Sequence, residues 1–221
     1  MNQELIHVYL MPGMAAGPSI FEHLNLSEEK FKIHHLEWII PNVKESIANY
    51  AKRMTKKIPH DNIVLIGVSF GGILVQEMSK HIKLRKLIII SSVKTKHELP
   101  RRMKLARYTR TYKLVPTYLM SNVEVLAKYV FGNTIKKRLD LYERYLSVRD
   151  KRYLDWALEQ VVCWNQETPI PGVIHIHGDN DRVFPFHHIK GCIPVKGGTH
   201  IMIINKYKWF NENLPQIILE T

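Results

Sequence analysis

One short segment of the sequence combines a possible nucleophile with glycines that would expose it. Residues 67–72 (GVSFGG) follow an apolar run at 63–66 and precede a helical pattern. Glycines two positions before and two after Ser69 would let a sharp strand-to-helix turn pass close to its neighbours, which thrusts the serine hydroxyl outward. The N-terminus of the helix then points free N–H groups at the reacting centre. Gly-x-Ser-x-Gly also occurs by chance, but the strand before it and the helix after it favour a nucleophilic Ser69 over a plain glycine-rich turn.

A serine nucleophile needs a general base and an acid that orients the base. Near the C-terminus, residues 174–178 (IHIHG) run from an expected strand into a loop that holds Asp179 and Asp181. His200 follows 19 positions after Asp181, in a Gly-Gly-Thr-His segment ahead of the last helical pattern. The order serine, aspartate, histidine, each in a loop after a strand, is one in which catalytic triads occur. Either aspartate fits as the acid at this point, and a surface turn is the alternative for both.

The elements that must position these residues alternate in type along the chain. Short apolar runs, which we expect to be strands, lie at 6–10, 31–40, 62–66, 84–90, 173–176 and 192–195, and helical spacing appears at 43–57, 71–81 and 201–214. This alternation predicts an α/β fold with a mostly parallel, doubly wound sheet covered on both faces. In the helix at 43–57, Ile47, Tyr50, Ala51 and Met54 share one side. In the closing helix, Trp209 and Phe210 are expected to face inward.

A long segment without a convincing strand interrupts this pattern. Residues 93–165 predict helices at 103–112, 123–131, 135–147 and 151–164. We expect them to form a helical cap, inserted into a core of residues 1–92 and 166–221 and folded over the carboxyl ends of the strands, where such sheets bind ligands. Several apolar side chains of this insert are candidates for an acyl pocket or for the cap's own core: Tyr108, Tyr112, Leu114, Tyr118, Leu119, Met120 and Trp164.

The positive charge of the chain is concentrated in the same insert. Between Lys94 and Arg152 there are 16 basic and five acidic residues, which gives +11 of the chain's net +12. From Arg101 to Lys113 a basic residue recurs every three positions, so the series sweeps around a helix and forms no single stripe. A solvated cap surface explains this charge, and an anionic substrate or an anionic membrane surface is the alternative. No nucleic-acid-reading motif accompanies the charge, so the sequence does not favour a nucleic acid as partner.

Composition places the chain among ordinary globular proteins. Its 221 residues and 25.9 kDa suit one domain with an inserted subdomain. No run approaches the roughly 18 apolar residues of a membrane span, and the N-terminus has no basic region followed by an apolar core, so we expect no signal peptide and a cytoplasmic protein. Cys163 and Cys192 are too few and too far apart for a disulfide framework or a zinc cluster, and we expect two reduced thiols.

The three motifs in this order resemble those of the α/β-hydrolase superfamily, in particular a small single-domain serine hydrolase with a helical cap. The resemblance covers nearly the whole chain, from the turn at 12–13 to the segment that ends at His200. It implies that Ser69 is the nucleophile and that His200 acts as general base and then as general acid. Asp181 fits the family's His-Gly-x-x-Asp position and would orient the histidine, so the resemblance favours it over the other aspartate.

The resemblance also implies an oxyanion hole made of two backbone N–H groups. One belongs to Phe70, directly after the nucleophile, and the second to the loop after the first strand. Where relatives often read His-Gly-x, this chain has Met11 and Pro12 before Gly13. Since proline has no N–H, Met14 is the expected second donor and Met11 the reserve. Gly13 as a plain turn residue is the alternative.

The implied reaction is two-step acyl transfer from a carboxylic ester or thioester, without a metal or an organic cofactor. A serine at the nucleophile position argues against the haloalkane and epoxide branches of the fold. Carbon–carbon bond hydrolysis or lyase activity with the same triad is the alternative chemistry, and a non-catalytic ligand-binding protein of this fold is the alternative class. An adaptor that uses the charge of the insert is a further alternative.

No metal site is expected from the sequence. His175 and His177 would share one face of a strand, and His187 and His188 are adjacent in the chain. No third ligand can be placed beside either pair, whereas a metal site needs at least three.

Overall fold

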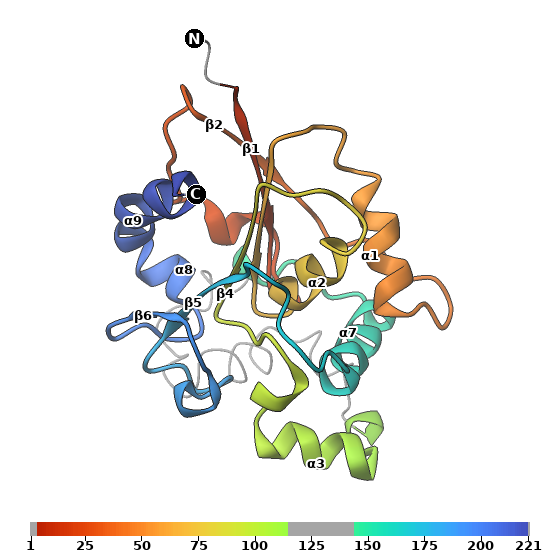
Figure 1. Ribbon diagram of the computed structural model, residues 1–221. Coiled ribbons are helices and arrows are strands. Elements are labelled where there is room, and N and C mark those ends of the chain that lie inside the picture. Colours follow the sequence, from red (N-terminus) through yellow and green to blue (C-terminus); the bar gives the residue numbers. More distant parts are fainter. Residues whose placement is uncertain (1–3, 115–143, 221) are drawn as a thin grey trace.

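A parallel β-sheet forms the centre of the molecule (Figure 1). The computed structural model describes residues 4–114 and 144–220. Within them, six strands run in the order β2-β1-β3-β4-β5-β6, and every pairing is parallel. The strands are β1 (Ile6–Met11), β2 (Phe31–His35), β3 (Ile63–Val68), β4 (Lys86–Ile90), β5 (Ile174–Gly178) and β6 (Ile193–Val195). The predicted α/β fold with a doubly wound parallel sheet is therefore confirmed.

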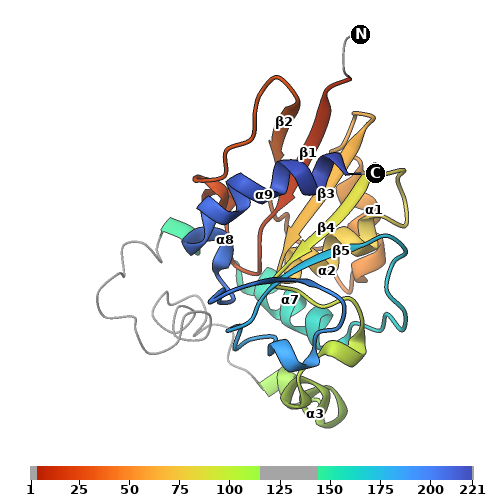
Figure 2. The same ribbon diagram turned by 60° about the vertical axis from the view of Figure 1, so that its left-hand side comes forward.

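Helices cover both faces of the sheet, which explains why its central strands are apolar without alternation. On one face lie α1 (Ile47–Thr55), α2 (Phe70–Met78) and α7 (Lys151–Cys163), and on the other lie α8 (Met202–Asn205) and α9 (Tyr207–Leu219) (Figures 1 and 2). All six residues of β3 and all nine of α2 are buried. In β1 only His7 departs from full burial.

The predicted elements differ from the observed ones mainly at their ends. The second strand ends at His35 instead of residue 40, because Leu36 and Trp38 turn into the core beside α1. In α1, Tyr50, Ala51 and Met54 are buried as predicted.

The prediction of a single closing helix at 201–214 is wrong. The chain forms α8 and α9 with a break at Lys206, and α9 continues through Pro215 to Leu219. Leu214 and Ile218 are fully buried, so packing against the sheet holds the helix together beyond the proline. Phe210 faces the core as predicted, whereas Trp209 is only partly buried.

The described part of the charged insert is helical. It contains α3 (Arg101–Thr109) and α7, which correspond to the helices predicted at 103–112 and 151–164. The helix predicted at 123–131 and most of the one at 135–147 lie outside the described residues. Short 3-10 turns occur at Pro18–Phe21, Lys96–Glu98, Thr111–Leu114 and Phe186–His188. The proposed division into a core and a cap stays a prediction.

Two further observations concern membrane-spanning helices and the cysteines. Within residues 4–114 and 144–220, no helix combines the length and the apolar composition that a membrane crossing requires. Cys163 and Cys192 are free thiols, and both side chains are partly buried.

Candidate active site

Ser69 lies on the sharp turn between β3 and α2. Its φ of 54° places a non-glycine residue in the left-handed region, a strained conformation typical of exposed nucleophiles. Two hydrogen bonds hold the turn: the Ser69 N–H donates to the Ile90 carbonyl oxygen over 2.9 Å, and the Ser92 hydroxyl donates to the Ser69 carbonyl oxygen over 2.7 Å. A Cβ on Gly71 would lie 2.3 Å from the Pro12 carbonyl oxygen, so close backbone approach requires glycine there.

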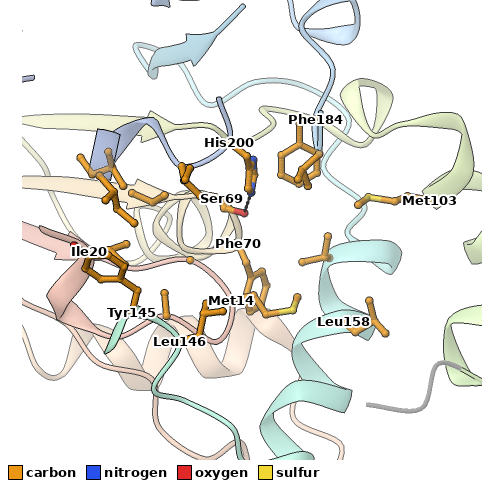
Figure 3. Close-up of a pocket in the computed structure, with 18 residues that line it drawn as sticks. Met14, Ile20, Ser69, Phe70, Met103, Tyr145, Leu146, Leu158, Phe184 and His200 are labelled. Carbon is orange, nitrogen blue, oxygen red and sulfur yellow. Dashed lines mark hydrogen bonds between the residues drawn. The ribbon is translucent and has the colours of Figure 1, made fainter. Parts of the chain in front are cut away.

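His200 connects Ser69 to Asp181 in one line of hydrogen bonds. Figure 3 shows the contact between Ser69 and His200. The Ser69 Oγ lies 2.9 Å from His200 Nε2, and His200 Nδ1 lies 2.9 Å from Asp181 Oδ2. With the proton on Nδ1, the imidazole donates to the carboxylate and its free Nε2 accepts from the hydroxyl. The three loops that follow β3, β5 and β6 therefore meet at one end of the sheet, as the sequence order predicts.

The surroundings of Asp181 keep its carboxylate ionised. Burial alone would raise its pKa, but the charge of His200, the hydrogen bond from that ring, nearby His177 and the Phe184 N–H outweigh burial and lower the pKa. The second oxygen, Oδ1, accepts from the N–H groups of Val183 at 2.8 Å and Phe184 at 3.0 Å. Both carboxylate oxygens are thus engaged, which fixes the orientation of the group toward His200.

Asp179, the other candidate acid, faces a different part of the loop. It is exposed, and its Oδ1 accepts from the Gly197 N–H over 2.7 Å. Asp179 therefore ties the loop after β5 to the segment that carries His200, while Asp181 contacts the histidine itself.

The two expected oxyanion donors lie on the wall of one cavity with Ser69 and His200 (Figure 3). Met14 belongs to the loop after β1, whereas Met11 is fully buried at the end of that strand, which favours Met14 as the second donor. Gly13 lies next to Ser69: a Cβ on it would be 3.4 Å from the Ser69 Cβ. The roles of Met14 and Phe70 remain predictions.

The cavity above Ser69 is apolar. Gly13, Met14, Ser69, Phe70 and His200 form its base. The other described residues that line it are Ala16, Ile20, Val68, Met103, Tyr145, Leu146, Leu158, Val161, Val183, Phe184, Ile201, Ile203 and Ile204. None of these is a lysine, arginine, aspartate or glutamate. Such a wall suits a hydrocarbon chain attached to the group that reacts at Ser69.

Of the insert residues that the sequence offered for this pocket, the four that the structure describes do not line its wall. Tyr108 is 89% exposed and Leu114 is 80% exposed. Tyr112 donates to Glu159, and Trp164 is buried in the core, where its Nε1 donates to Glu77 over 2.8 Å. Tyr118, Leu119 and Met120 lie outside the described residues. The insert instead contributes Met103, Tyr145, Leu146, Leu158 and Val161.

Comparisons with known proteins support the architecture. No family model and no curated protein matches the sequence. The fold is similar to a hydrolase from Oleispira antarctica (11% identity, TM-score 0.73, covering 100% of this chain and 93% of that one). It is similar to an enol-lactonase from Burkholderia xenovorans (12% identity, TM-score 0.73, covering 98% of this chain and 92% of that one). It is also similar to a thermophilic esterase from Thermogutta terrifontis (13% identity, TM-score 0.70, covering 98% of this chain and 90% of that one). The chain has the α/β-hydrolase fold.

In this α/β-hydrolase fold, Trp38 is a site residue that the sequence analysis did not single out. Its indole Nε1 donates to the Gly13 carbonyl oxygen over 2.9 Å, and its ring stacks on Phe70 with centroids 4.9 Å apart and an angle of 6°. Trp38 thereby braces both segments that carry the expected oxyanion donors. A lone tryptophan after an edge strand carries no sequence signal for this position.

We expect Trp38→Phe to lower kcat for an ester about 10- to 100-fold with little change in KM, less than the loss of a whole donor. The phenyl ring keeps much of the stacking but cannot hold the Gly13 carbonyl. Trp164→Phe is the matched control, because it also removes a buried indole hydrogen bond but lies away from the site. Equal loss of kcat in both variants would contradict a positioning role.

Two buried histidines, His175 and His177, lie on β5, the strand that precedes Asp181. His175 Nε2 lies 3.0 Å from His177 Nδ1, and His177 Nε2 lies 2.9 Å from the Phe184 carbonyl oxygen. Burial lowers the pKa of His177 and lowers that of His175 well below the usual value. Among the described residues, neither this pair nor His187 and His188 gains a third metal ligand.

These shifts predict acid sensitivity of the fold. A histidine with a lowered pKa stays neutral in the folded state, while the unfolded chain takes up its proton near pH 6.5, so stability is complete above that pH and falls below it. Each extra proton bound by the unfolded state costs about 1.4 kcal/mol per pH unit. In urea titrations from pH 7.5 to 5.5, His175→Asn should show a flatter decline than the wild type. The exposed His23→Asn should keep the wild-type slope, and an unchanged slope in His175→Asn would oppose this assignment.

Proposed function

We propose that the protein is a serine hydrolase that cleaves carboxylic esters or thioesters through a Ser-His-Asp acyl-enzyme mechanism. The observation that carries the proposal is the continuous hydrogen-bonded path from Asp181 through His200 to Ser69, at the base of an apolar cavity. The names of structural neighbours, which include esterases, support hydrolysis as the reaction class.

The mechanism follows from the positions of the three side chains. Ser69 Oγ attacks the carbonyl carbon while its proton moves to His200 Nε2, and Asp181 stabilises the imidazolium that forms. The N–H groups of Phe70 and Met14 stabilise the oxyanion of the tetrahedral intermediate. Collapse of the intermediate breaks the bond to the leaving alcohol or thiol, which takes the proton from Nε2. Water then attacks the acyl group by the same route and releases the acid.

The cavity wall favours an uncharged, hydrocarbon acyl group. No lysine or arginine is present among its described residues, so the basic residues of the described part of the insert do not contact an acyl chain there. Two basic residues of α3 instead hold neighbouring loops: Arg102 donates to the carbonyl oxygens of Arg182 and Val183, and Arg107 donates to that of Trp164. For the other basic residues of the insert, binding of an anionic leaving group or of an anionic membrane surface is a separate proposal.

We expect kcat/KM for p-nitrophenyl esters to rise from acetate toward medium-length chains, because each CH₂ buried in the cavity contributes about 0.8 kcal/mol, or roughly fourfold. Leu158→Phe, which fills part of the cavity, should lower the rate for octanoate more than for acetate. Leu105→Phe, on the exposed side of α3, is the control and should leave this ratio unchanged. A ratio unaffected by Leu158→Phe would place the acyl chain elsewhere.

The direct test is intact-mass analysis after treatment with a small fluorophosphonate. The wild type should gain one adduct, and peptide mapping should locate it on Ser69, because only an activated serine displaces fluoride at a useful rate. Panels of esters and thioesters then define the leaving group. A folded protein that forms no adduct and turns over no ester or thioester would refute the proposal and favour the ligand-binding alternative.

A further inference from the structure

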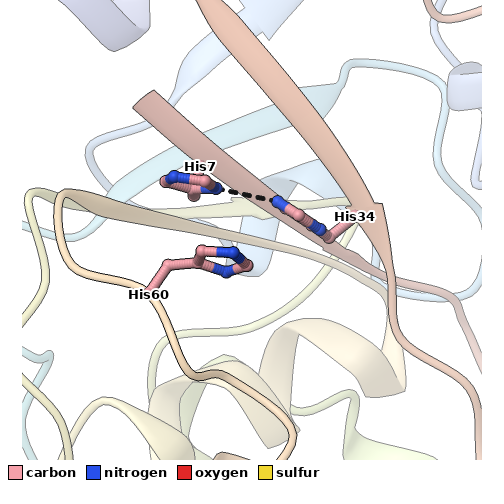
Figure 4. Close-up of side chains that lie close together, drawn as sticks. All are labelled: His7, His34 and His60. Carbon is pink, nitrogen blue, oxygen red and sulfur yellow. Dashed lines mark hydrogen bonds between the residues drawn. The ribbon is translucent and has the colours of Figure 1, made fainter. Parts of the chain in front are cut away.

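Three histidines from separate elements meet at the end of the sheet opposite Ser69 (Figure 4). His7 pairs with Ile63, the first residue of β3, whereas Ser69 follows the last residue of that strand. His34 lies on β2, directly across from Tyr9 of β1. His60 comes from the loop between α1 and β3 and places its ring over that of His7, with centroids 3.8 Å apart.

The ring nitrogens lie near the spacing of ligands around one small ion. His7 Nδ1 lies 2.9 Å from His34 Nε2, and one nitrogen from each of the three rings lies within 4.8 Å of the others. Zinc–nitrogen bonds of 2.0–2.1 Å in a tetrahedral site place ligand nitrogens about 3.4 Å apart. The His7–His34 pair is already close to this spacing. Because the His60 ring is stacked on His7, rotation about its side-chain bonds must turn a nitrogen toward the pair.

The lone pairs of this cluster are available. Two nitrogens 2.9 Å apart can hold only one proton between them, which a metal ion can replace. Burial first, and then the neighbouring histidines, lower the pKa of both His7 and His34. Lys32 adds positive charge near His34, whereas Glu4 adds negative charge near His7.

Tyr9 supplies the outer contact that orients a metal-binding imidazole. Its hydroxyl lies 2.5 Å from His60 Nδ1, and its ring stacks on His34 with centroids 4.5 Å apart. When His60 Nδ1–H donates to the Tyr9 hydroxyl oxygen, Nε2 of His60 has its lone pair free for an ion, as in sites where a second partner fixes the tautomer. A cleft lined by Tyr9, His34 and His60 connects the cluster to solvent.

We propose that His7, His34 and His60 bind one divalent transition-metal ion of the zinc class, at a site separate from the Ser-His-Asp path. Three imidazole nitrogens without a carboxylate select Zn²⁺, Cu²⁺ or Ni²⁺ over Mg²⁺ and Ca²⁺. Three ligands leave a fourth position for water. No local sequence pattern marks these three histidines, because they are far apart in the chain and are brought together by strand register and a loop.

The test is calorimetric titration of ZnCl₂ into tag-free, chelator-stripped protein, with MgCl₂ as a parallel titrant. We expect one zinc equivalent and no magnesium. His34→Asn and His60→Asn should each weaken zinc binding at least tenfold, and Tyr9→Phe should weaken it about 10- to 100-fold. His35→Asn is the matched control, because it is the neighbour of His34 on an exposed position. Undiminished binding in both His34→Asn and His60→Asn, or no binding by the wild type, would overturn the site.

A second measurement needs no variant. Diethyl pyrocarbonate modifies accessible imidazoles, and peptide mass spectrometry locates the products. Zinc should protect His7, His34 and His60 and leave His35 reactive, while zinc-independent labelling of the three would also overturn the proposal. Fluorophosphonate labelling of Ser69 with and without zinc keeps the two proposals apart, because the metal site should not alter the adduct.

Discussion

Ser69→Ala should lower kcat for an ester substrate by about 10⁴- to 10⁶-fold, while KM changes little. Alanine removes the oxygen that forms the acyl-enzyme, yet leaves the cavity and the expected oxyanion donors in place. The residual rate should therefore still exceed that of the uncatalysed reaction. A φ of 54° strains alanine about as much as it strains serine. The variant should therefore have nearly the same free energy of unfolding as the wild type.

The measurement is steady-state turnover of a medium-chain p-nitrophenyl ester together with fluorophosphonate labelling. Ser79→Ala, at the other end of α2, is the matched control and should retain both turnover and the adduct. Wild-type turnover in Ser69→Ala would refute the serine mechanism outright. Loss of turnover with an adduct still present would instead place the reactive group on another residue.

Asp181→Asn should lower kcat by about 10⁴-fold, although the two side chains have nearly the same shape. Asp181 Oδ1 accepts two backbone N–H groups, so the amide oxygen of asparagine must take that position. Its NH₂ group then faces His200 Nδ1, which can only accept, and the ring proton moves to Nε2. Because Nε2 then carries the ring proton, it cannot take the proton of Ser69, and His200 no longer acts as the general base.

Asp179→Asn is the matched control for this prediction. Asparagine at position 179 can still accept from the Gly197 N–H through its amide oxygen, so kcat should stay within about threefold of the wild type. Rates at several pH values should show the Asp181→Asn loss throughout the neutral range. If the two variants lose activity equally, the acid of the triad is misassigned.

The strand-to-helix turn at Ser69 could be predicted because its cause is local. Only glycine fits the close backbone contacts at Gly67 and Gly71, and the apolar runs beside them have the length of buried strands. The same local signals predicted six strands in the correct order along the chain. They failed at Lys206, where the closing helix breaks without a glycine or proline to mark the position.

The order of motifs along the chain, together with backbone sterics, is sufficient to predict the α/β sheet and to nominate Ser69 and His200. It does not separate Asp181 from Asp179, since the two differ only in which way a loop turns them. It also cannot show that Trp38 braces Gly13, that Trp164 belongs to the core, or that His7, His34 and His60 converge. These relations join residues that are far apart in the sequence, and they exist only once strand register and helix packing have brought the side chains together.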